Sequence, residues 1–163
     1  MFVAINRVAI YSLENAAGTP SYLHTKVCVI YDTWACVGSD NANQRSWTHD
    51  SELSCAVLDT SGDSTNSRAR SVRLELACEH LGDNAAIEDL NDPIQTFEAF
   101  RKTASDLDSW NSNGGVGPRP TGHLRTYTQA ALPWWTKLWD APLYRILYDP
   151  DGRSYIARRA RRF

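Results

Sequence analysis

The chain has 163 residues, enough for one domain with a buried core. Its 42% hydrophobic and 22% charged residues are typical of a soluble globular protein. The net charge of -2 gives no overall attraction to nucleic acid or anionic membranes. No apolar run approaches the roughly 18 residues of a membrane-spanning helix.

The first part of the chain alternates apolar runs with turn residues, which predicts strands joined by short connections. The runs after Lys26 are continuously apolar, as is typical of strands buried on both faces between helices. Gly18 and Pro20 predict a turn, and polar residues 39–50 predict a loop. The expected strands cover residues 7–14, 22–31, 33–38 and 51–59, with the turn at 15–21.

Helical periodicity replaces the strand pattern in the middle of the chain. A helix is expected over 64–81, and Gly82 supplies its stop. A second helix is expected to begin at Asp92 and Pro93, with proline at its first position. The apolar faces of the two helices consist of Leu74, Ala77, Cys78 and Leu81, and of Phe97, Phe100, Ala104 and Leu107.

Residues 111–163 read as an extension of the same domain. A Gly/Pro-rich loop at 111–121 precedes an aromatic segment at 132–148, and a turn follows at 149–152. We therefore expect one domain over residues 1–163. Its fold class is α/β, with a mixed sheet flanked by helices. The chain opens almost directly on a strand, so we expect an upstream segment or a second subunit to complete the sheet.

Two features of the last part have alternative interpretations. Trp134, Trp135 and Trp139 are expected to pack in the core, and a membrane-facing anchor is the alternative. The chain also ends in a basic cluster, which is either a solvated tail or a contact for phosphate or lipid headgroups. This cluster consists of Arg158, Arg159, Arg161 and Arg162.

The four cysteines lack the C-x-x-C spacing of a zinc site. Three of them lie in apolar runs, which favours buried free thiols in a reducing compartment. No signal peptide is visible. We expect a cytoplasmic protein, with peripheral membrane contact as an open alternative. The cysteines are Cys28, Cys36, Cys55 and Cys78.

Polar residues with phosphate chemistry gather between residues 24 and 52. On a strand, His24 and Lys26 point to the same face, so an imidazole that can attack or donate a proton lies beside a fixed positive charge. Hydroxyl and amide groups that can donate hydrogen bonds to phosphate oxygens follow at Ser39, Asn41 and Asn43. Glu52 can orient an imidazole.

This combination resembles the phospholipase D signature, H-x-K-x4-D-x6-G-S-x-N followed by a carboxylate. His24, Lys26, Gly38, Ser39 and Asn41 stand at the family spacings, and Glu52 stands where the downstream acid is placed. The run GSDNANQRSWTHDSE and the flanks of the motif look like the second motif copy of bacterial phospholipase D proteins. The resemblance implies the C-terminal half of a fold that has two such halves.

The sequence departs from the family pattern in two places. Tyr31 stands where the motif has Asp, and Asp32 follows it on the opposite strand face. We expect this change to affect stability or activity rather than the reaction. A second H-x-K motif is absent from the sequence. His49, His80 and His123 are therefore expected to be surface or loop residues.

The resemblance implies a phosphodiesterase that hydrolyses phospholipids, or transfers their phosphatidyl group, through a phosphohistidine intermediate without a cofactor. Such a site needs two motifs, so the second must come from a missing N-terminal half or from another subunit. One alternative is a homodimeric single-motif endonuclease, although the net charge argues against nucleic acid. The other alternative is an inactive fragment that acts as a binding or scaffold module.

Overall fold

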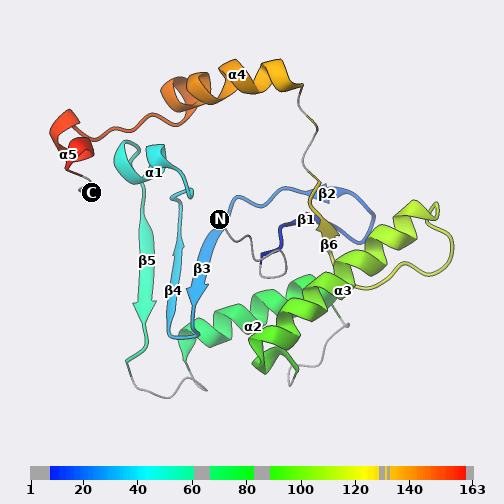
Figure 1. Cartoon of the computed structure of the whole chain (residues 1–163). Coiled ribbons are helices and arrows are strands. Elements are labelled where there is room, and N and C mark those ends of the chain that lie inside the picture. The colour runs from blue at the N-terminus through cyan, green and yellow to red at the C-terminus, as the bar shows by residue number, and fades with distance from the viewer. Residues whose placement is uncertain (1–7, 61–66, 83–88, 129–130, 132, 161–163) are drawn as a thin grey trace.

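The computed structural model describes residues 8–60, 67–82, 89–128, 131 and 133–160. Helices accompany two small sheets in this part of the chain, which confirms the α/β class (Figure 1). The expectation of one mixed sheet is wrong here, because the described strands pair only antiparallel. The strands are β1 (Tyr11–Glu14), β2 (Pro20–Ser21), β3 (Lys26–Ile30), β4 (Trp34–Gly38), β5 (Ser54–Leu58) and β6 (Leu124–Thr126).

The two expected long helices are present, and each begins at a side-chain cap. Ser67 accepts a hydrogen bond from the Arg70 amide at the start of α2 (Arg68–Leu81), which ends at Gly82 with a φ of 61°. Asp92 caps α3 (Pro93–Ser112), preceded by the short 3-10 helix η3 (Asp89–Asn91). Residues 64–66 of the expected first helix lie outside the described residues.

The hydrophobic core lies between these helices and the sheet of order β2-β1-β6. Leu13 on β1 pairs with Leu124 on β6, and Leu124 joins Leu81 from α2 in the buried cluster. Leu107 on α3 is also fully buried. The expected apolar faces of the two helices therefore supply this core, although the partly exposed Phe97 is not part of the cluster. Glu14 is buried beside the core and pairs with Arg119 and Arg125.

The second sheet has the order β3-β4-β5 and is less covered than its sequence predicts. Helix α2 contacts all three strands, yet every residue of β5 stays exposed, and Leu58 keeps 65% of its surface. The expectation that these strands are buried on both faces is therefore wrong, because the described residues supply no second layer over this sheet. The expectation of buried thiols is also wrong, since Cys28 and Cys55 are exposed and Cys36 and Cys78 are half-buried.

Two local expectations near the second sheet also need correction. The strand expected over 22–31 begins only at Lys26, so His24 lies in the connection between β2 and β3. The polar loop expected over 39–50 contains a short helix, α1 (Gln44–Thr48). Asn43 starts this helix by accepting a hydrogen bond from the Ser46 amide, 2.9 Å away.

The C-terminal aromatic segment forms helices that stand away from the core (Figure 1). Helix α4 (Trp134–Leu143) passes into the π-helix η4 (Tyr144–Tyr148), and α5 (Tyr155–Arg159) follows. Core packing of the tryptophans is wrong, because Trp134, Trp135 and Trp139 keep 70%, 56% and 55% of their surfaces exposed. No described helix is long and apolar enough to cross a bilayer.

Candidate functional site

The antiparallel register brings the motif residues to one end of the second sheet. Lys26 begins β3, Gly38 ends β4 and Ser54 begins β5, and these three residues are aligned across the sheet. His24 therefore precedes the first strand at this end, Ser39 follows the second and Glu52 precedes the third. Residues 24 and 52, far apart in the sequence, are thus brought to the same end through two hydrogen-bonded strand pairs.

Gly38 is required sterically because the Ser54 side chain lies where its Cβ would be. A Cβ at this position would lie 1.8 Å from the Ser54 Oγ and 2.7 Å from the Ser54 Cβ. The φ of Gly38 is not in the left-handed region, so the requirement is for space rather than for backbone freedom. The glycine of the motif therefore lets β4 and β5 pair closely beside Lys26.

Ser39 and Glu52 are bonded to each other across the strand ends. The Ser39 Oγ donates to the Glu52 Oε2 at 2.5 Å and accepts from the Leu53 amide at 3.1 Å. The Ser39 amide also donates to the Leu53 carbonyl at 3.1 Å. A hydroxyl has one proton, and Ser39 directs it to the carboxylate. Binding of a phosphate oxygen by this hydroxyl therefore requires an exchange of that hydrogen bond.

The two asparagines hold the segment after β4 against α1. The Asn43 Oδ1 caps the helix, which leaves the amide nitrogen of its side chain as a donor. The Asn41 Nδ2 lies 3.5 Å from the Ser46 Oγ, a long contact at the limit of hydrogen bonding. Both side chains thus lie at the motif end of the sheet, and some of their hydrogen-bonding groups are used to stabilise α1.

The side chains of His24 and Lys26 lie at the protein surface. The Lys26 Nζ donates to the His24 carbonyl at 2.7 Å, which joins the two residues through the backbone. The exposed His24 ring contacts the Tyr22 ring, with centroids 6.1 Å apart. Among the described residues, no carboxylate bonds the imidazole, and Glu52 is bonded to Ser39 instead. An unencumbered imidazole beside an ammonium group can attack an incoming phosphodiester.

A pocket of about 420 Å³ adjoins this end of the sheet. Lys26 and Gly38 line it, together with Asp40, Trp47 and Ser54, whereas His24 and Glu52 lie outside its lining. The motif pattern does not single out Asp40, Trp47 or Ser54. The strand register would have found Ser54, because it is aligned with Gly38. The pocket lining therefore contains one basic side chain, Lys26, and one acidic side chain, Asp40.

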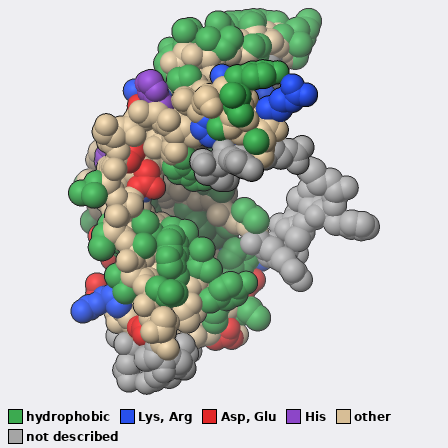
Figure 2. All heavy atoms as spheres, turned by 90° about the vertical axis from the view of Figure 1, so that its left-hand side faces the viewer, with side chains coloured by type: hydrophobic (Ala, Val, Ile, Leu, Met, Phe, Trp, Pro, Cys, Tyr) green, Lys and Arg blue, Asp and Glu red, His purple; other side chains and the backbone are tan. Residues whose placement is uncertain are grey.

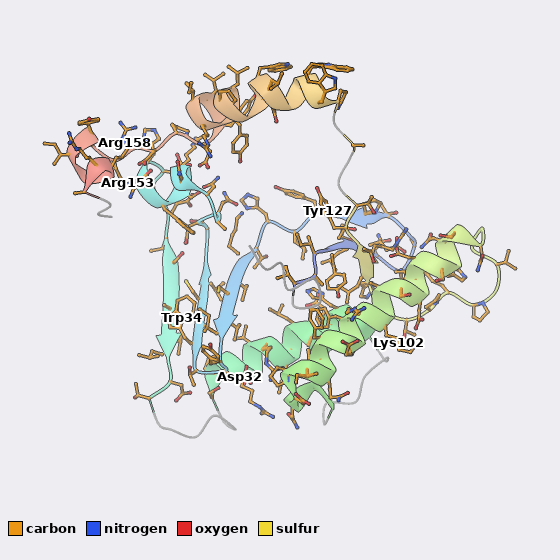
Figure 3. All side chains as sticks on the ribbon, viewed as in Figure 1. Asp32, Trp34, Lys102, Tyr127, Arg153 and Arg158 are labelled. Carbon is orange, nitrogen blue, oxygen red and sulfur yellow. The ribbon has the colours of Figure 1, made fainter. Side chains whose placement is uncertain are left out.

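Asp32 lies at the opposite end of the hairpin from the motif end (Figure 3). It makes a bidentate ion pair with Arg73 on α2, at 2.6 and 2.7 Å, and this hydrogen bonding raises the pKa of the guanidinium. Tyr31, which is 91% exposed, makes no such contact among the described residues. Roughly 13 Å of strand separates Asp32 from Lys26, so the carboxylate fastens the sheet to α2 and does not reach the motif end.

The remaining histidines and the basic cluster lie elsewhere. His49 is exposed at the C-terminal cap of α1, and the His123 Nδ1 lies 3.0 Å from the Glu14 carbonyl. Burial lowers the pKa of the half-buried His80, and nearby His123 adds to that effect against the opposing charge of Glu79. Arg158 and Arg159 are exposed on α5, and residues 161 and 162 lie outside the described residues.

Comparison with known proteins gives one partial similarity. No family model matches the chain, and no solved structure matches it. A stretch of 72 residues, 43% of the chain, is 35% identical to phospholipase D alpha 4 of Arabidopsis thaliana. That stretch covers 9% of the plant protein, so the chain spans a small part of its length. The chain is thus partly similar to a phospholipase D.

Proposed function

We propose that the chain supplies one half of a phosphodiesterase site of the phospholipase D type, acting on phospholipids. The convergence of His24, Lys26, Ser39 and Glu52 at one end of the sheet is the observation on which this proposal depends. The partial similarity to a phospholipase D agrees with it. An exposed imidazole next to an ammonium group is suited to attack on a phosphate diester.

In the proposed first step, a nitrogen of the His24 imidazole attacks phosphorus and forms a P–N bond. The P–O bond to the leaving alcohol breaks, and a second acid donates the proton that this alcohol needs. Water, or another alcohol, then attacks phosphorus, breaks the P–N bond and restores the imidazole. Lys26 stabilises the negative charge that develops on the phosphate oxygens, and the Asn41 and Asn43 amides add hydrogen bonds.

The contacts within the chain support the proposal that a second motif is needed. Among the described residues, His24 has no acid within hydrogen-bonding distance that could protonate the leaving group. Glu52 is hydrogen-bonded to Ser39, and no hydrogen bond joins it to His24 among the described residues. We propose that the second imidazole comes from another polypeptide segment or another copy of the chain, and that Glu52 orients that imidazole.

The test is turnover of a chromogenic phosphodiester across a range of protein concentrations, with light scattering on the same samples. His24→Ala is the test variant, and His49→Asn is the matched control, because His49 is an exposed imidazole that holds none of the signature positions. Activity that rises with the dimer fraction, disappears in His24→Ala and persists in His49→Asn supports a site shared between two copies.

Binding of inorganic phosphate separates a half-site from an inactive module. The His24 ring resonances should shift in the NMR spectrum when phosphate is added, and Lys26→Gln should abolish that shift. A spectrum that does not respond to phosphate, combined with no turnover at any concentration, contradicts the proposal and favours a binding or scaffold role.

A further inference from the structure

Helix α4 is amphipathic, and its apolar face has no partner among the described residues. Trp135, Leu138, Trp139 and Pro142 recur at i, i+3, i+4 and i+7, which is one side of a helix. Leu138 keeps 68% of its surface exposed, more than either neighbouring tryptophan. The acidic Asp140 falls on the opposite side. Exposed apolar faces of this kind mark binding surfaces.

The π-helix η4 extends this surface with further aromatic and aliphatic side chains. Tyr144 and Tyr148 stack with ring centroids 6.2 Å apart, and Ile146 and Leu147 are 67% and 63% exposed between them. Figure 2 shows hydrophobic side chains gathered over this end of the molecule. Tryptophan and tyrosine are the residue types enriched where a membrane meets water.

The charge distribution of the chain identifies the kind of surface that fits. Residues 133–163 contain seven basic and three acidic side chains, whereas residues 1–132 contain ten and sixteen. The net charge of -2 therefore conceals a basic C-terminal segment. Exposed Arg158 and Arg159 lie on α5, at the same end of the molecule as α4 (Figure 1). An anionic bilayer complements both the aromatic surface and these arginines.

We infer that α4 and η4 bind the surface of an anionic phospholipid bilayer, lying in its plane, with the α5 arginines on lipid headgroups. Helix α4 has ten residues and is about 15 Å long, roughly half the thickness of the hydrocarbon layer. An amphipathic helix of this length inserts its apolar face at the headgroup boundary and keeps its polar face in water.

The bound segment would also hold the motif end of the sheet near the lipid. The Arg45 amide on α1 donates to the Asp149 carboxylate at 2.6 Å, directly after η4. The Gly152 amide donates to the Thr48 Oγ1 at 2.8 Å, at the other end of α1. These bonds connect the aromatic segment to α1, which lies between Asn43 and Glu52 of the motif segment. The inference goes beyond the proposed function, because membrane binding needs no turnover.

Vesicle flotation with the whole chain tests the inference, using phosphatidylcholine vesicles with and without phosphatidylglycerol. Burial of a large apolar side chain corresponds to about tenfold in partitioning. Trp135→Ser combined with Trp139→Ser should therefore weaken binding by about a hundredfold. Arg158→Gln combined with Arg159→Gln should weaken binding to anionic vesicles by about tenfold, and high salt should act in the same direction.

Ile94→Ser is the matched control, because Ile94 on α3 is 70% exposed and is distant in sequence from α4. It should bind as the wild type does, and so should His24→Ala, which separates membrane binding from the proposed catalysis. Circular dichroism confirms that each variant is folded. Absence of binding to anionic vesicles, or unchanged binding in the tryptophan variant, overturns the inference. If the wild-type chain self-associates but does not bind vesicles, and the tryptophan variant no longer self-associates, the surface is a contact between copies of the chain.

Discussion

Gly38→Ala should destabilise the fold through a single steric conflict. The new Cβ would lie 1.8 Å from the Ser54 Oγ and 2.7 Å from the Ser54 Cβ, whereas real Cβ atoms essentially never approach closer than 3.0 Å. The hydroxyl can rotate away, but the Ser54 Cβ is fixed to the backbone of β5. The strands must therefore separate by several tenths of an ångström. Overpacking of this kind costs about 1–3 kcal/mol, a large share of the roughly 5–15 kcal/mol that stabilises a domain.

Replacement of the opposing residue provides the decisive control. Ser54→Gly removes both atoms that the new Cβ would meet first, and leaves the Asp40 Oδ1 at 2.7 Å, on a side chain that can move. In this background, Gly38→Ala should cost less than about 1 kcal/mol, which gives a coupling energy of about 1–2 kcal/mol in a double-mutant cycle.

Urea unfolding followed by tryptophan fluorescence measures all four proteins of this cycle. If Gly38→Ala costs the same in the wild-type and the Ser54→Gly backgrounds, the reasoning is refuted. That result would mean that Gly38 and Ser54 are not aligned across the sheet as the register requires.

Three further predictions concern the body of the fold. Asp32→Asn should lower the free energy of unfolding by about 1–3 kcal/mol, because it breaks a bidentate ion pair whose side chains are only 19% exposed. Tyr31→Ala should change this free energy by less than about 0.5 kcal/mol. Urea titration of the two variants measures the difference. Burial acts to raise the pKa of the Glu14 carboxyl, but hydrogen bonds from Arg125 and Arg119 lower it overall from 4.5. The stability that ionised Glu14 contributes is therefore fully present above pH 4.5 and is lost as the pH falls through the lowered pKa of the folded state. Glu14→Gln should flatten the acid side of a plot of unfolding free energy against pH. An unchanged plot would contradict this. Leu81→Ala should cost about 2–5 kcal/mol in thermal or urea unfolding, because Leu81 is fully buried in the core cluster; a cost below about 1 kcal/mol would show that the site collapses around the smaller side chain.

The sequence predicts the helical part of this fold well, because local signals determine it. Asp92 and Pro93 start α3 where the capping pattern places its beginning, and Gly82 ends α2. The short helix α1 was not predicted, although Asn43 is a favourable N-cap residue. The polar residues of this segment give no apolar periodicity.

The sequence pattern and the structure differ in which apolar residues are buried. Burial depends on whether another part of the protein covers the apolar surface, and the pattern does not show this. The apolar run of β5 predicts a strand covered on both faces, yet the described residues cover it too little to bury any of its side chains. The same reasoning fails for Trp134 and Trp139, which are exposed on α4. An apolar run indicates that a surface needs a partner, but it does not identify that partner.

The candidate site was predicted as a set of residue types, and the structure adds their arrangement. The spacing of His24, Lys26 and Ser39 predicts phosphate chemistry, and the strand register brings these residues to one end of the sheet. The hydrogen bond between Ser39 and Glu52 could not be derived from spacing, because it depends on how β4 and β5 align.

The central claim, that His24 is a nucleophile toward phosphorus, is tested most directly by trapping the protein-bound intermediate. Bis(p-nitrophenyl) phosphate suits this test because nitrophenolate departs without a proton, so the first step does not need the second imidazole. We predict a burst of nitrophenolate together with a nitrophenyl phosphate adduct on the peptide that contains His24, located by mass spectrometry. The adduct should be absent from His24→Ala and present in His49→Asn. Absence of an adduct in the wild-type chain, or an adduct that persists in His24→Ala, would contradict the account.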